Sequence, residues 1–483
     1  MTIDRRRVLL SSLLLGSSAA LTRGRYAFAA EQGYGPLGPV LDDDTGLPLL
    51  RLPEGFRYRS FGWTGEPMTD GTPTPDRHDG MAVVHALDRR GDSFVLIRNH
   101  ERAFASRLGG AATPVYDRFA APPRIEGCGG GTTALVFKEN RFVETVPTLA
   151  GTLVNCAGGA TPWGSWLTCE EIVVDGREDG AHAHGYVFEV PAPHLGVASA
   201  KPIVDMGRMK HEAVAVDSGR GYVYLTEDNG PSGFYRFRPN ETQGRLGALE
   251  RGGTLEMLSV RGRPNADLGS VDQGDAYDIE WVRIDEPDAA AERRGGPPDG
   301  PIAIGLGKSG PFLQGEALGG AEFRRLEGCF AHGGLIYFID TTGGAAQMGT
   351  VWALTPTDDG PDSLRCVYAS PGEHEADHID NVCVSPRGGI VLCEDGGGAG
   401  LLSLERGTRL VGLGLDSAPF PFADNNLIVD GRLERRPWIE PGDYRGMEFA
   451  GACFSPRGDR LFVNIQTPGV TFEIRGPWES GPL

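Results

Sequence analysis

The sequence is short of positive charge: 46 lysines and arginines stand against 65 aspartates and glutamates, a formal net charge of −19. A surface of that sign repels phosphate backbones, which argues against general nucleic-acid binding. After the first thirty residues the chain has no apolar run of the roughly 20 residues that a membrane helix needs. It also has no G-x-S-x-G motif and no Walker loop. The common serine-hydrolase and P-loop chemistries are therefore not indicated.

Eight cysteines are present, but none forms a C-x-x-C pair. Several lie in apolar, strand-like stretches, such as Val382-Cys383-Val384 and Leu392-Cys393. Small apolar surroundings are typical of buried free thiols. We expect most of these cysteines to be unpaired.

Glycine and proline are abundant, with 72 and 35 copies in 483 residues. The glycine content is about twice the usual ~7 %, while the hydrophobic fraction of 40 % still allows a large core. This balance argues against a helical bundle, a coiled coil or a disordered chain. It favours many short strands joined by turns.

The N-terminus reads as an export signal over residues 1–29. Arg5-Arg6-Arg7 precedes an apolar stretch that ends at Leu21, and Ala27-Phe28-Ala29 fits a cleavage site. Consecutive arginines resemble a twin-arginine signal, although Asp4 stands where serine or threonine is usual. An ordinary secretory signal is the alternative. We expect a periplasmic or secreted protein without stable membrane insertion, with the twin-arginine export machinery as a partner.

The remaining chain, 30–483, repeats one unit: an apolar strand, a short turn, and a second apolar strand that ends in an acid or amide. Six units are visible, and their second strands end at Glu101, Glu170-Glu171, Glu227-Asp228, Asp340, Glu394-Asp395 and Gln466. Hairpins repeating at irregular intervals predict an all-β fold, a six-bladed β-propeller with long inter-blade insertions in one domain. Two packed sandwiches are the competing architecture. The range 243–312 carries no motif and is expected to decorate the rim.

Equivalent strand ends in a propeller point toward one axis, so these acids should meet in a central channel. A second set of acids precedes the first strand of the later units: Glu212, Glu327, Asp380 and Glu448. Buried carboxylates are costly and repel one another, which predicts cations at the centre. Carboxylate oxygens suit calcium. The alternative is that each acid begins a solvated turn.

Three further side chains complete the candidate site. Cys128 lies in the Gly-rich loop Glu126–Gly131 and is open to a softer metal, unless it is only a small buried residue in a turn. Arg325 shares a strand face with Glu327 and could bind an oxyanion bidentately, or else pair with one of the acids. Asn99 could donate its amide to the same anion.

The sequence resembles the PhoX family of bacterial alkaline phosphatases from about Leu52 to Trp478. The matching segments are Asn99-His100-Glu101, Gly127-Cys128, Gly158-Gly159-Ala160-Thr161-Pro162-Trp163-Gly164-Ser165-Trp166 with Glu171, His211-Glu212-Ala213, Arg325-Leu326-Glu327-Gly328, Asp380-Asn381, and Phe462–Gly469.

The resemblance implies a central channel holding a pair of ferric ions and several calcium ions. It implies an iron thiolate at Cys128 and iron-holding or bridging carboxylates at Glu212 and Glu327. Further metal ligands are implied at Glu101, Glu171, Asp228, Asp380 and Glu394. Asn99 and Arg325 are implied as catalytic phosphate contacts.

The predicted activity is therefore hydrolysis of small phosphate monoesters by a metal-dependent monomer, because several cations would neutralise the phosphoryl oxygens. Two alternatives stay open. One is a calcium-stabilised propeller that only binds partners. The other is a different metal-dependent hydrolase, a lactonase or a phosphodiesterase, on the same scaffold.

Overall fold

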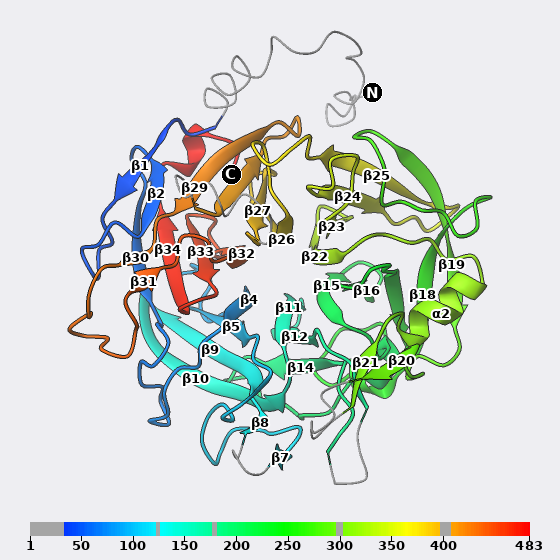
Figure 1. The fold of residues 1–483 in the computed structure, drawn as a ribbon, viewed down its shortest axis with the longest axis horizontal. Helices are drawn as coiled ribbons and strands as arrows, with labels where there is room; N and C mark the ends of the chain where they lie inside the picture. Colours follow the sequence, from blue (N-terminus) through cyan, green and yellow to red (C-terminus); the bar gives the residue numbers. More distant parts are fainter. Residues whose placement is uncertain (1–32, 122–125, 176–180, 296–302, 397–406) are drawn as a thin grey trace.

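The computed structural model describes residues 33–121, 126–175, 181–295, 303–396 and 407–483. The predicted export signal at 1–29 lies outside these residues. The described chain is almost entirely β-structure, with one α-helix, α2 (Gly310–Ala317), and 3-10 turns at Val204–Met206, Leu249–Arg251 and Trp478–Ser480. The sheets stand around a common centre in a propeller-like arrangement (Figure 1). The expectation of an all-β fold is confirmed.

The first sheets of the chain are simple antiparallel meanders. One runs in the order β10-β9-β5-β4 and the next in the order β11-β12-β14. Their strands are β4 (His78–Ala86), β5 (Phe94–His100), β9 (Gly130–Lys138), β10 (Arg141–Thr152), β11 (Asn155–Ala160), β12 (Ser165–Glu170) and β14 (Val187–Pro191).

The largest sheet joins two such meanders at their outer edges, in the order β15-β16-β17-β18-β19-β25-β24-β23-β22. The range 243–312 supplies β18 and β19 to this sheet, so much of it is built into the β-structure. The strands are β15 (His211–Asp217), β16 (Tyr222–Glu227), β17 (Phe234–Pro239), β18 (Gly253–Val260), β19 (Ala276–Ile284), β22 (Leu326–His332), β23 (Leu335–Asp340), β24 (Thr350–Thr355) and β25 (Asp362–Ala369).

The last sheets take in strands from the start of the described chain. The orders are β26-β27-β28-β29-β2-β1 and β32-β33-β34-β3. Strand β3 pairs along β34, from Arg57 opposite Arg475 to Phe61 opposite Thr471, which ties the two ends of the described chain together. The strands are β1 (Leu37–Val40), β2 (Leu50–Pro53), β3 (Arg57–Phe61), β26 (Ile379–Val384), β27 (Ile390–Glu394), β28 (Arg409–Leu413), β29 (Pro419–Asn425), β32 (Phe449–Phe454), β33 (Arg460–Ile465) and β34 (Val470–Arg475).

Short strands outside these sheets form small pairings on the loops. They are β6 (Phe104–Ala105), β7 (Ala120–Ala121) and β8 (Glu126–Cys128), then β13 (Val174–Asp175), β20 (Arg293–Gly295) and β21 (Ala303–Leu306), and finally β30 (Ile428–Val429) and β31 (Gly442–Asp443).

The innermost strand of each meander packs against the innermost strand of the next, in the closed sequence β4, β11, β15, β22, β26, β32 and back to β4. Glycine allows this approach. A Cβ at Gly80 of β4 would lie 2.5 Å from the Cα of Ala157 in β11, and one at Gly328 of β22 would lie 2.9 Å from the carbonyl oxygen of Asp380. The high glycine content thus allows backbone-to-backbone packing at the axis.

The hydrophobic core lies between neighbouring sheets. The largest cluster fills the space between the sheets of β26–β29 and β32–β34 and includes Phe422, Phe472 and Trp478, each at most 1 % exposed. A second cluster packs Phe234, Phe338 and Trp352 between the two halves of the nine-stranded sheet. All eight cysteines lie in described segments, and each is a buried free thiol, as expected. Among the described residues, no helix has the length and apolarity to span a membrane.

Candidate active site at the axis

The innermost hairpins share one irregularity that turns a side chain toward the axis. In the first hairpin His78 pairs with His100 and Met81 with Arg98, so the inner strand carries one extra residue. The same shift follows Asn155, His211, Leu326 and Ile379 in β11, β15, β22 and β26. Such β-bulges re-aim side chains. The residues directly after these paired positions are Asp79, Cys156, Glu212, Glu327 and Asp380.

The second strands place another set of acids at the same mouth, one residue beyond the last pair of each ladder. These residues are Glu101, Glu171, Asp228 and Asp395. Alternation along a strand puts each on the face opposite its predecessor. The predecessors are engaged within the sheets: Glu170 accepts the amide N–H of Gly185 at 2.9 Å, and Glu394 pairs with Arg409.

The acids of the two sets lie close together, and each of them is buried or partly buried. Glu212 belongs to two groups of possible metal ligands. In the first group, ligand atoms of Glu212, Cys156 and Glu171 lie within 4.8 Å of one another. In the second group, ligand atoms of Glu212, Glu327 and Asp380 do so. The Cys156 thiol donates to Glu212 Oε1 at 3.2 Å. Glu212 is 1 % exposed and Glu327 is 3 % exposed.

Burial and mutual repulsion raise the pKa values of these groups. Burial raises the pKa of Glu212 well above its ordinary value, and the charges of Asp380 and Glu171 raise it further. The same causes raise the pKa of Asp380 to about 7, with Asp395 as its strongest repelling neighbour. Burial raises the pKa of Glu101 to about 7. Without a counter-charge, the cluster holds protons at neutral pH.

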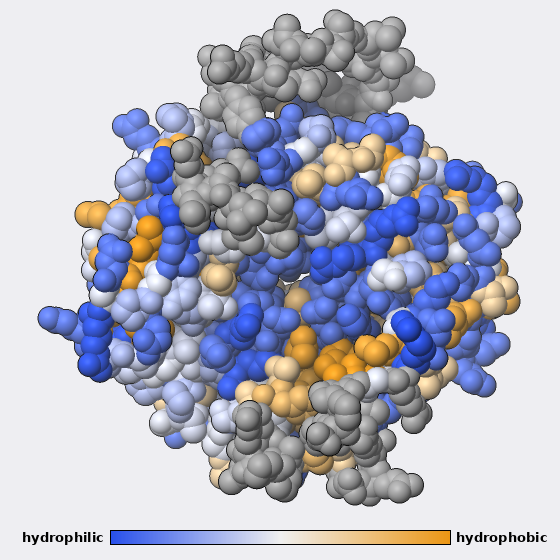
Figure 2. Space-filling view, viewed as in Figure 1, coloured by the Kyte–Doolittle hydropathy of each residue, from blue (hydrophilic) through white to orange (hydrophobic). Residues whose placement is uncertain are grey.

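Basic and amide groups balance part of this charge. Arg325 binds Asp228 bidentately, with Nε–Oδ1 at 2.8 Å and Nη2–Oδ2 at 2.9 Å, and its Nη2 also donates to Glu327 at 2.7 Å. Its side chain remains 38 % exposed. Gln466 donates to both Glu101 and Glu448 at 2.6 Å. Figure 2 shows a hollow near the centre of this face, with hydrophilic residues on both sides of it and an apolar patch beside it.

The donor set fits multivalent cations. Among the described residues, Glu212 Oε2 and Asp380 Oδ1 are buried oxygens with no hydrogen-bond partner. Unsatisfied buried oxygens of this kind are rare unless an ion or water completes them. Carboxylates suit hard cations, and the Cys156 thiol suits a softer transition metal. Burial raises the pKa of Cys156 well above its usual range, so a bound metal is what would favour its thiolate.

The structure brings together six of the predicted metal ligands: Glu101, Glu171, Glu212, Asp228, Glu327 and Asp380. Arg325 stands beside them. Cys128 does not join them; it lies beside Asp117 and His184 instead. Glu394 faces into its sheet, where it accepts from Arg409 and from the amide N–H of Asp377 at 2.9 Å.

Asn99, predicted to contact an anion, is fully engaged inside the protein. Its Nδ2 donates to the carbonyls of Cys156 at 3.0 Å and Ala157 at 2.7 Å. Its Oδ1 accepts from Trp166 and Thr168, both at 2.8 Å. Asn99 is 0 % exposed. It therefore holds the strand that carries Cys156 in place and does not face the channel.

Sequence reasoning missed Asp79 and Cys156, and within the pair Glu394-Asp395 it chose Glu394 as the ligand. One signal could have found the first two. At the bulges, a ligand-type residue is followed by a small residue or an asparagine, as in Asp79-Gly80, Cys156-Ala157, Glu212-Ala213, Glu327-Gly328 and Asp380-Asn381. The small residue permits the close strand contact at the axis, while the residue before it turns inward.

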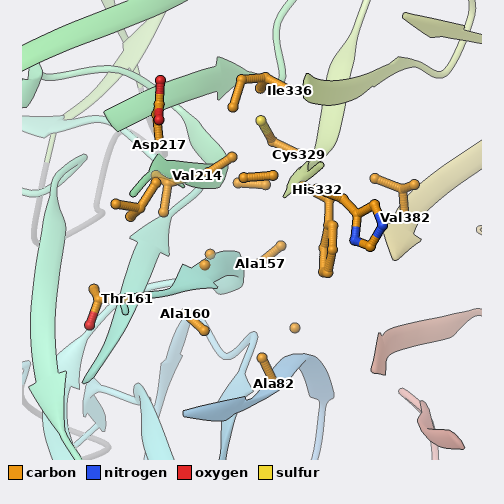
Figure 3. A pocket seen from close by; sticks show the side chains of 18 of the residues that line it. Ala82, Ala157, Ala160, Thr161, Val214, Asp217, Cys329, His332, Ile336 and Val382 are labelled. Atoms are coloured by element: carbon orange, nitrogen blue, oxygen red, sulfur yellow. The ribbon is translucent and has the colours of Figure 1, made fainter. Parts of the chain in front are cut away.

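A cavity of about 360 Å³ lies further along the inner strands. Residues that follow the bulges line it, among them Ala82, Ala157, Val214, Cys329 and Val382 (Figure 3). Its lining is mostly small and apolar, and none of the clustered acids contributes to it. The clustered acids therefore lie at the end of the channel where the inner strands begin.

A comparison with known protein families gives a match over most of the chain. The family described as "Alkaline phosphatase PhoX" matches residues 32–146 and 118–469. The structure of Pseudomonas fluorescens PhoX in complex with vanadate, a transition state analogue, matches with a TM-score of 0.62 and 16 % identity, covering 94 % of this chain and 99 % of that one.

Two more distant structures also match. A gluconolactonase from Xanthomonas campestris has a TM-score of 0.29 at 13 % identity, covering 83 % of this chain and 97 % of that one. A putative 6-phosphogluconolactonase from Bacteroides fragilis has a TM-score of 0.34 at 13 % identity, covering 84 % and 93 %. No curated protein sequence gives a match.

Proposed function

The chain belongs to the PhoX family of alkaline phosphatases, and from that premise we propose that it hydrolyses small phosphate monoesters at the acid cluster on its axis. The observation that carries the proposal is the convergence of buried carboxylates and a thiol at the bulges of successive inner hairpins. A cluster of this charge is suited to cations, and clustered cations are suited to a phosphoryl group.

We propose that the cluster holds a pair of ferric ions and several calcium ions. Cys156, Glu212 and Glu327 would hold the iron, and Cys156 takes the role first expected for Cys128. The thiol supports this assignment, because it lies against Glu212 within the cluster. Glu171 and Asp380, together with the neighbouring acids Asp79, Glu101, Asp228 and Asp395, would supply oxygen ligands to calcium.

Bound cations would neutralise the phosphoryl oxygens and acidify a nucleophilic water. Arg325 is one of the protein's own cations at this mouth. It stands alongside Arg77 and Lys210, whose charges act on Glu101 and Glu171. The Nε and Nη2 of Arg325 are held by Asp228 and Glu327, and its Nη1 makes no hydrogen bond within the described part of the chain. The half-exposed guanidinium is therefore pre-oriented to donate to an equatorial phosphoryl oxygen.

Asn99 acts indirectly, by holding another residue of the site in place. Its amide fixes the carbonyls of Cys156 and Ala157, and it is itself fixed by Trp166 and Thr168. We assign it as a positioning residue for the thiol. This role agrees with the segment Gly158–Trp166, because Trp166 donates to the amide oxygen of Asn99.

We propose that the ring of innermost strands is that of a six-bladed propeller. The support is the closed series of contacts from β4 through β11, β15, β22, β26 and β32. The two halves of the nine-stranded sheet would then be separate blades that share an outer edge.

We propose that residues 1–29 direct export by the twin-arginine machinery to the periplasm or the medium, and that the protein works there as a monomer. The arginine run and the cleavage motif support export. Export of a folded protein would also carry a metal cluster assembled before translocation.

The test is hydrolysis of a chromogenic phosphate monoester by the full chain purified without chelator. We expect turnover by the wild type and a loss of at least about 100-fold in Cys156→Ser, as for removal of a group that stabilises transition-state charge. Cys383→Ser is the matched control, because Cys383 is a buried thiol of β26 whose charged or thiol neighbours are other cysteines.

Three results would overturn the proposal. Equal turnover by Cys156→Ser and wild type would remove the thiol from the site. Turnover of phosphodiesters or lactones without monoesters would indicate another hydrolase. Loss of folding on metal removal from a protein without any hydrolytic activity would indicate a binding scaffold.

A further inference from the structure

A second group of metal-ligating side chains lies off the axis, around His184. Asp117, Cys128 and His184 each present a ligand atom, and these atoms all lie within 4.8 Å of one another. The three side chains are at most 1 % exposed. They come from distant segments: Asp117 precedes β7, Cys128 ends β8, and His184 precedes β14.

The imidazole is oriented by a carboxylate on its far side. His184 Nδ1 donates to Glu170 Oε1 at 2.6 Å. Glu170 is fixed in turn, because it accepts the amide N–H groups of Leu153 and Gly185, both at 2.9 Å. A carboxylate that binds one nitrogen of a histidine sets the tautomer and presents the other nitrogen to a metal. Here that nitrogen is Nε2, which faces Cys128 and Asp117.

The distances among the ligand atoms match those around a tetrahedral zinc ion. Zn–S of about 2.3 Å, Zn–N of about 2.05 Å and Zn–O of about 2.1 Å give S···N and N···O separations of about 3.6 Å and 3.4 Å at tetrahedral angles. The observed separations are 3.7 Å from Cys128 Sγ to His184 Nε2 and 3.3 Å from His184 Nε2 to Asp117 Oδ2.

The charges of the ligands themselves match a divalent ion, and the Glu170 carboxylate is a further negative charge behind His184. A thiolate at Cys128 and a carboxylate at Asp117 carry two negative charges, and His184 is neutral when its Nδ1 proton is held by Glu170. Asp117 is kept in place by the amide N–H groups of His182, at 2.8 Å, and Phe119, at 2.7 Å. Mixed sulfur, nitrogen and oxygen donors suit zinc better than calcium.

We propose that Asp117, Cys128 and His184 form a zinc-class metal site, separate from the axial cluster, with a water as the fourth ligand. The ion would join the segment before β7 and the end of β8, which carry Asp117 and Cys128, to the segment before β14, which carries His184. Glu170 links this site to the axis, because its neighbour Glu171 faces the axial cluster. The zinc site would therefore stabilise the strand end that carries Glu171.

The competing interpretation is a metal-free cluster in which an imidazolium at His184 is shared between Glu170 and Asp117. Both carboxylates are within hydrogen-bonding or ion-pair distance of the ring, at 2.6 Å and 3.3 Å. A proton would then occupy the place of the metal. The two interpretations differ in metal content and in whether the sulfur of Cys128 bonds to a metal.

The first measurement is the zinc content of the full chain, purified without chelator, as wild type and as Cys128→Ser. We expect Cys128→Ser to lose about one equivalent of zinc, with a circular dichroism spectrum that matches the wild type. Cys383→Ser is the matched control and should keep its zinc. Equal zinc in the wild type and Cys128→Ser would overturn the proposal.

The second measurement identifies the sulfur directly, and its refuting outcome does not depend on Cys128→Ser folding. Cobalt replaces zinc and gives a thiolate charge-transfer band in the near ultraviolet. The band should appear in cobalt-loaded Cys156→Ser, where the axial thiol is gone, and should vanish in Cys156→Ser/Cys128→Ser. If cobalt-loaded Cys156→Ser shows no such band, the metal-free cluster is the correct interpretation. Neither readout is phosphatase activity, so this proposal fails independently of the proposed function.

Discussion

Two neighbouring acids at the end of β27 should respond to substitution in opposite ways. Glu394 faces into its sheet and pairs with Arg409, and each side chain is 4 % exposed. Glu394→Gln therefore removes the charge of a carboxylate that a buried guanidinium binds, and breaking such a pair typically costs about 3–5 kcal/mol of unfolding free energy. We expect the lower end of that range, because Arg409 also donates to the carbonyls of Glu373 and His374, both at 2.8 Å.

Asp395 faces the axis, and its charge raises the pKa values of Glu101, Asp380 and Glu448. Asp395→Asn removes one source of repulsion. If the pKa of a neighbouring acid falls by about one unit, the metal-free protein gains about 1 kcal/mol at neutral pH. The same substitution removes a cation ligand, so metal binding and phosphatase turnover should fall.

The assay combines urea unfolding of chelator-treated protein with turnover of a chromogenic phosphate monoester. We expect Glu394→Gln to be destabilised, with the turnover of its folded fraction within a few-fold of the wild type. We expect Asp395→Asn to be at least as stable as the wild type when metal-free and to lose most of its turnover. The opposite pattern, in which only Glu394→Gln abolishes turnover at unchanged stability, would refute the assignment of the two faces.

The metal-free protein should lose stability between about pH 5 and pH 8, because the pKa values of Glu101 and Asp380 are raised to about 7. In that window the folded state holds protons that the unfolded chain has released, at an upper limit of about 3 kcal/mol for Glu101 and about 4 kcal/mol for Asp380. Unfolding curves in chelator that coincide at pH 5 and pH 8 would contradict this. Arg325→Ala should lower kcat/KM for phosphate monoesters about 10- to 100-fold, because it removes a charge-assisted donor; unchanged steady-state kinetics would place the guanidinium outside the reaction. Asn99→Ala should lower kcat with little change in KM, and a rise in KM alone would show that Asn99 touches the substrate after all.

The repeat pattern was sufficient to predict the all-β, propeller-like fold and the mouth at which the acids meet. Glu212, Glu327 and Asp380 are recognisable because each stands just before a short apolar strand that follows the repeat. The glycine content indicated many short strands joined by turns, and the structure adds a second role for glycine in the contact of Gly80 with Ala157. These features depend on residues that are close together in the sequence, so they can be predicted from the sequence alone.

The choice between adjacent acids could not be made from sequence. Along a strand, a shift of one residue moves a side chain to the opposite face. Glu394-Asp395 and Glu170-Glu171 look alike as pairs, and only the register of the ladders shows that the second member of each faces the axis. The prediction of Glu394 as a ligand therefore chose the member that the structure places inside the sheet.

Only the tertiary structure shows which of the two thiols, Cys128 or Cys156, lies at the axis. Cys128 attracted attention because its Gly-rich loop looks open, whereas Cys156 looks like a core residue of a strand. The bulge in β11 turns Cys156 toward Glu212. The neighbours of Cys128, Asp117 and His184, become visible only when three distant segments pack together.

The most direct test of the central claim is anomalous diffraction from crystals of the native protein, collected at the iron edge. The account predicts iron peaks at the axis within bonding distance of Cys156 and Glu212. An axis without any anomalous peak, with the acids bridged only by water or protons, would contradict it.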